Sequence, residues 1–83
     1  MTNFFQLLVK VLPEPILNAV VGVVIGQDAA NTKKAIRVKL SCASDTEGGA
    51  APLKAVFCQW AGKTPQQVVV TVDPVNCTVE IKG

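Results

Sequence analysis

Apolar and polar positions near the start of the chain follow a helical period. Between Thr2 and Leu12 the polar residues Asn3, Gln6 and Lys10 recur every three or four positions and line one stripe, while mostly phenylalanine, leucine and valine fill the remaining positions. Prolines at positions 13 and 15 follow, and proline stops a helix because it has no backbone N–H. The pattern predicts a short amphipathic helical arm over residues 1–12.

The run Ile16–Ile25 is almost wholly apolar, with Asn18 as its only polar side chain. A helix would place Asn18, Gly22 and Gly26 on one narrow face, which suits close helix packing. A strand would point alternate residues to opposite faces, and the β-branched content favours this alternative. The run is therefore predicted to be an apolar strand or helix, and the choice between the two stays open.

Residues Phe4–Gly26 together have the length of a membrane span. Their Phe, Leu, Ile and Val side chains favour insertion by roughly 4–8 kcal/mol, while Lys10 costs about 3 kcal/mol near the middle and Glu14 a similar amount. Because these contributions nearly cancel, membrane contact is the less favoured alternative.

From Ala35 onward apolar and polar residues alternate, as is typical of strands with one buried face. Strands are expected at four segments, which are Ala35–Ala43, Pro52–Trp60, Gln66–Asp73 and Cys77–Lys82. Short turns between alternating strands indicate antiparallel pairing in chain order. The sequence thus predicts an antiparallel sheet over residues 35–83. The whole chain, 1–83, is expected to form a single α+β, mainly β domain, a small meander of four to five strands with a short N-terminal amphipathic helix.

Hydrophobic residues make up 49% of only 83 residues. A domain of this size has little interior, so an apolar sheet face and an apolar helix stripe leave more hydrophobic surface than one chain can cover. We therefore expect a homo-oligomer. The predicted assembly interface consists of the apolar residues Phe4, Phe5, Leu8, Leu12, Val21, Val23 and Ile25.

The charges suggest a second, weaker kind of contact. Eight basic residues exceed six acidic residues, which gives a net charge of +2. The strand period would gather basic side chains on the solvent face of the sheet, with one tryptophan on which a nucleic-acid base can stack. The predicted site for single-stranded nucleic acid is Lys33, Lys34, Arg37, Lys39, Lys54 and Trp60.

The remaining candidate chemistry is sparse. The chain has no histidine, so the commonest general base and metal ligand is missing, and we expect no catalysis, no metal site and no cofactor. In a meander, Cys42 and Cys77 would lie three strand spacings apart, about 14 Å, which is too far for a disulfide. Cys58 would face the opposite side. All three cysteines are therefore predicted to be free thiols, which suits a reducing compartment.

These expectations favour a self-assembling structural subunit, and a small viral or phage coat component is the favoured kind. Such a subunit would be located in the virion or the cytoplasm. One alternative is a membrane-attached or pilus-like extracellular filament subunit in which Phe4–Gly26 forms one long helix. Another is a small module that binds single-stranded nucleic acid.

Overall fold

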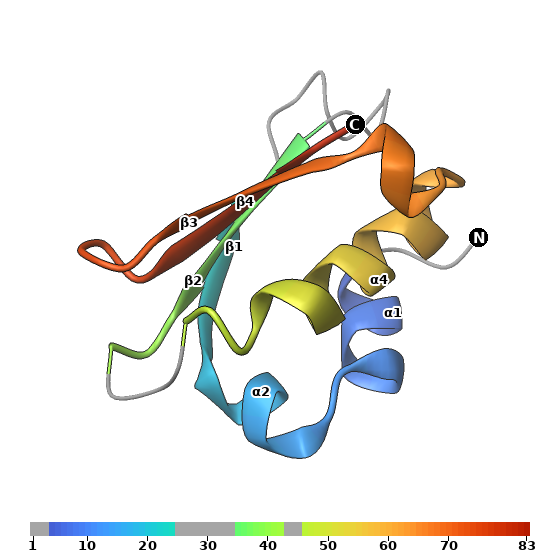
Figure 1. Cartoon of the computed structure of the whole chain (residues 1–83). Coiled ribbons are helices and arrows are strands. Elements are labelled where there is room, and N and C mark those ends of the chain that lie inside the picture. The colour runs from blue at the N-terminus through green and yellow to red at the C-terminus, as the bar shows by residue number, and fades with distance from the viewer. Residues whose placement is uncertain (1–3, 25–34, 43–45) are drawn as a thin grey trace.

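The computed structural model describes residues 4–24, 35–42 and 46–83. Its elements are, in chain order, α1 (Phe4–Val11), α2 (Glu14–Ala19), β1 (Val20–Val24), β2 (Ala35–Leu40), α4 (Ala50–Ala61), the 3₁₀ helix η1 (Pro65–Gln67), β3 (Val69–Asp73) and β4 (Thr78–Lys82). The α-helices lie on one side of a four-stranded antiparallel sheet, so the molecule has two layers (Figure 1). The predicted α+β class, with an antiparallel sheet and an N-terminal helix, is confirmed.

The apolar run Ile16–Ile25 is divided between a helix and a strand. Pro15 lies in the first turn of α2, where its missing N–H costs nothing, and the helix ends at Ala19. The β-branched sequence Val-Val-Gly-Val-Val then forms β1. Neither alternative holds for the whole run, and the single long helix over Phe4–Gly26 is wrong because α1 ends at Val11 and β1 is extended.

The sheet has the strand order β1-β2-β4-β3, with every neighbouring pair antiparallel. A meander would place the strands in chain order, so the predicted order is wrong. The cause is α4, which the alternation had predicted to be a strand over Pro52–Trp60. The fully buried residues Leu53, Val56 and Phe57 are in fact spaced by three and four and therefore line one face of a helix. Gly62 follows the helix as its C-terminal cap, and its φ of 68° is a left-handed conformation that glycine adopts easily.

The core lies between the sheet and the helices. The strand register aligns four valines across the inner face of the sheet, in the order Val23, Val38, Val79 and Val72. Val38 and Val79, at the centre of this valine row, are fully buried. From the helix layer, Phe4 contacts Trp60 edge to face with the ring centroids 5.2 Å apart, which holds α1 against α4.

The prediction of three free cysteines is wrong for two of them. Cys42 and Cys77 form a disulfide with a Cα–Cα distance of 5.5 Å. The bond is possible because β2 and β4 are direct neighbours, and the Leu40 N–H donates to the Cys77 carbonyl at 2.8 Å beside it. Cys58 is a buried free thiol, as predicted. A reducing compartment was expected from three free thiols, whereas disulfides persist in oxidising environments.

Candidate assembly surface

Strand β1 is an edge of the sheet. It pairs with β2 on one side, and within the described parts of the chain no strand pairs with its other side. None of its five residues is charged, and the side chains of Val21 and Val24 are 64% and 66% exposed. Natural proteins usually protect an open edge with charges, proline or a covering element, because its unpaired N–H and C=O groups attract other strands. An uncharged valine-rich edge is therefore a candidate contact surface.

A bulge in β1 adds to the unpaired backbone on this edge. Val20 is opposite Leu40 and Gly22 is opposite Lys39, so Val21 is an extra residue without a partner on β2. From Gly22 to Val24 the pairing with β2 is regular. The regular part of the strand thus holds Gly22 and Val24 on the solvent face and Val23 on the core face.

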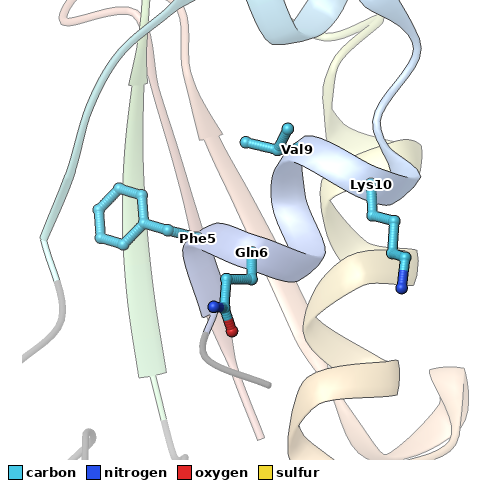
Figure 2. Close-up of a pocket in the computed structure, with 4 residues that line it drawn as sticks. All are labelled: Phe5, Gln6, Val9 and Lys10. Carbon is cyan, nitrogen blue, oxygen red and sulfur yellow. The ribbon is translucent and has the colours of Figure 1, made fainter.

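Helix α1 carries further exposed apolar side chains. Phe4, Leu7 and Leu8 are buried, whereas Phe5 and Val9 are 54% and 63% exposed. Figure 2 shows that Phe5 and Val9 point to the side of α1 that is opposite to α4. Gln6 and Lys10 complete the shallow, open depression that these two residues line. We call Phe5, Val9, Val21 and Val24 the apolar flank.

The residues of the predicted assembly interface fall into different surroundings. Phe4, Leu8 and Leu12 are buried in the chain's own core, so their side chains are not available to a partner. Val23 is half-buried and packs against that core, and Ile25 lies outside the described residues. Phe5 and Val21 are exposed. The sequence did not indicate Val9 and Val24 as interface residues. The packing of α1 against α4 decides which side of α1 is exposed, and the bulge in β1 decides which of its valines are exposed.

The predicted nucleic-acid site is divided between two layers. Arg37 and Lys39 point to the solvent face of the sheet, but Lys54 and Trp60 belong to α4, in the helix layer on the other side. Their placement on the sheet surface was wrong because α4 is not a strand. Trp60 is half-buried between Phe4 and Phe57 rather than open to stack on a base. Lys33 and Lys34 lie outside the described residues.

On the solvent face of the sheet, basic charge is partly neutralised. Arg37 donates to Glu80 at 3.0 Å, and the Lys82 ammonium lies 3.3 Å from the same carboxylate. The hydrogen bond from Arg37, followed by that from Lys82, lowers the pKa of Glu80 below its ordinary value. Arg37 therefore has a carboxylate partner across β2 and β4, and nucleic-acid binding by Arg37 and Lys39 stays a prediction.

The turn between β3 and β4 is organised by Asp73. Its carboxylate accepts hydrogen bonds from the backbone N–H groups of Val75 and Asn76 at 3.0 and 3.1 Å, and from the side-chain amide of Asn76 at 2.7 Å. The bonds from Asn76 are the main reason that the pKa of Asp73 is lowered. Pro74 follows Asp73 in this turn, and its fixed φ suits the second position of a turn.

The residues that the structure describes lack two further features. No group of three or more histidine, cysteine, aspartate or glutamate side chains is placed to hold a metal ion in that part of the chain. Over the same ranges, no helix has the length and apolar character needed to cross a membrane.

Comparison of the chain with models of protein families, with curated proteins and with solved structures found no match.

Proposed function

We propose that the chain is a self-assembling structural subunit, and that its work is done by contact between copies rather than by catalysis. The observation that carries this proposal is the apolar flank, which combines an open, uncharged edge strand with two exposed apolar side chains of α1. Exposed apolar surface next to unpaired strand backbone favours association with another chain.

We propose that this subunit is a small coat component of a virus or phage. A small two-layer domain that pairs with another copy along one open edge would form the dimeric building block of such a coat. The Cys42–Cys77 disulfide supports an oxidising setting, such as a virion surface or an extracellular assembly, over a reducing cytoplasm. The alternative is an extracellular filament subunit, but one in which Phe4–Gly26 does not form a single long helix.

Light scattering coupled to size-exclusion chromatography tests the proposal directly. The native chain, at micromolar concentration and above, is expected to give a mass greater than its monomer mass of 8.7 kDa, and the mass should rise with concentration. A constant 8.7 kDa across the series would contradict the proposal. Electron microscopy of the assembled fraction separates the settings, because a coat component forms closed shells and a filament subunit forms rods.

A further inference from the structure

The occupant of the open β1 edge can be identified from the strand itself. We infer that it is β1 of a second copy of this chain, paired antiparallel about a two-fold axis at Val23. This inference rests on the proposed function and gives it a partner and a geometry. Two-fold pairing uses the same patch on both chains, so the strand must be complementary to itself.

The first support is the valine row on the inner face of the sheet. It starts at Val72 on β3 and ends at Val23, which is half-buried at the edge. Pairing Val23 with Val23 of the second copy would continue the row without a break, through four more valines. The inner face of the joined eight-stranded sheet would remain apolar along this row, and side chains directly opposite each other across strands stabilise a sheet.

The second support is a match of shapes on the solvent face. With the axis at Val23, Gly22 lies opposite Val24 of the second copy, and Val24 lies opposite its Gly22. A side-chain carbon built on Gly22 would have no atom within 4 Å, so there is open space above this residue. Val24 is 66% exposed and projects from the same face. Each valine would cover the space above the glycine that faces it, twice by symmetry.

The basic side chains of the two copies are also far enough apart for this register. Lys39 is opposite Gly22 and Arg37 is opposite Val24 within one chain. In the joined sheet Lys39 of one copy and Arg37 of the other would be three strand spacings apart, about 14 Å. This distance exceeds the Debye length of about 10 Å at 0.1 M salt, so their repulsion is screened.

Disulfide trapping between two variants, each with one added cysteine, tests the register. Gly22→Cys and Val24→Cys are made separately with Cys58→Ala to remove the native free thiol, and the two proteins are mixed and oxidised mildly. Directly opposite residues have Cα atoms about 4.5–5.5 Å apart, within the range of a disulfide. Two copies of the same residue, one position from the axis, are about 7–8 Å apart and fall outside it. Neither substitution is strained, since Gly22 has room for a side chain and Val24 is exposed.

The expected result is a mixed dimer, with one Gly22→Cys chain bonded to one Val24→Cys chain. It should be in at least roughly fivefold excess over either same-variant dimer, because only the opposite pair has disulfide geometry. Val69→Cys, at a 67% exposed position on the other edge strand, is the matched control and should give no excess with either variant.

Two outcomes of the trapping experiment would overturn the inference. A dominant same-variant dimer would overturn the register, and no crosslink at all would overturn the strand pairing. Light scattering on the same unoxidised samples separates this inference from the proposed function. Assembly without the mixed crosslink removes this inference alone, and a monomer removes the proposed function too.

Discussion

The two edges of the sheet differ in how they meet solvent. Strand β1 has five uncharged residues, a bulge and exposed valines at positions 21 and 24. Strand β3 ends at Asp73, carries Thr71 on its solvent face, contacts α4 and leads into a turn tied by three hydrogen bonds. Both are open edges of the same sheet within the described residues, yet only β1 lacks polar and charged residues. We therefore propose that assembly uses the β1 edge and expect the β3 edge to remain in solvent.

A lysine on each edge is the strongest test of this difference. Val24→Lys places a charge on the β1 edge, and the two-fold axis brings a second lysine into the same interface. Like charges brought close together at an interface cost several kcal/mol, so association should weaken roughly 1,000-fold, which corresponds to about 4 kcal/mol. Sedimentation equilibrium measures the constant.

The matched control is Val69→Lys, because Val24 and Val69 are 66% and 67% exposed on opposite edges. The β3 variant should associate like the native chain. If Val69→Lys weakens association as much as Val24→Lys, the distinction between the edges is wrong.

Removal of the disulfide should lower the free energy of unfolding without affecting one edge of the sheet more than the other. The bond joins Cys42, just after β2, to Cys77, just before β4. These are the two central strands, and the bond closes a loop of 35 residues. Cys42→Ser with Cys77→Ala should lower the free energy of unfolding by about 2–4 kcal/mol, mainly because the unfolded chain gains freedom. Urea unfolding measures this loss. The folded fraction should still assemble, and a folded variant that stays monomeric would show that the disulfide shapes the β1 edge.

The α1 part of the apolar flank should contribute less than the strand. Phe5→Ser with Val9→Ser removes side chains that are about half exposed in one chain, so the area left for a partner is worth roughly 1–2 kcal/mol. Association should weaken about tenfold, since each 1.4 kcal/mol is a factor of ten. Val75→Ser, in the turn beside β3 and 85% exposed, is the control and should change nothing. An unchanged association constant for the double variant would restrict the interface to β1.

The smallest effect concerns the turn that completes the β3 edge. The pKa of Asp73 is lowered in the folded protein, so the ionised carboxylate stabilises the turn at neutral pH. This contribution is lost as the pH falls below the ordinary value of 3.8 and through the lower pKa of the folded state. Asp73→Asn should therefore lower Tm slightly at pH 7, and the difference from the native chain should shrink at pH 2–3. A difference that grows on acidification would contradict this assignment. Association should be unaffected at pH 7.

Much of the fold could be predicted from the period of the apolar residues. The helix α1 and strands β2, β3 and β4 lie where the helical stripe and the alternation indicated. The segment Pro52–Trp60 is different because Leu53 and Phe57 fit both periods, being two steps of a strand alternation and also one helical turn apart. Pro52 in the first turn and Gly62 after the last turn were the helix signals available. That single error also caused the wrong strand order and hid the Cys42–Cys77 bond.

The assembly surface could be predicted only in part for a related reason. The sequence indicates that the chain has more apolar residues than its own core can bury. It does not indicate which of them that core buries. Phe4, Leu8 and Leu12 are buried because α4 provides a second helix for α1 to pack against. The bulge at Val21 changes the alternation of β1, so Val24 rather than Val23 is exposed. Both features depend on contacts between segments far apart in the chain.

Amide hydrogen exchange along the two edge strands shows which of them pairs with a second copy. The protein is labelled at a concentration where it is assembled and again after dilution to the monomer, and peptides that cover β1 and β3 are compared by mass spectrometry. We expect the amides of Val20–Val24 to gain protection on assembly, because a partner strand then binds their outer N–H groups. The amides of Val69–Asp73 should exchange equally in both samples. Protection that appears on β3 and not on β1, or on neither strand of the assembled protein, would contradict this expectation.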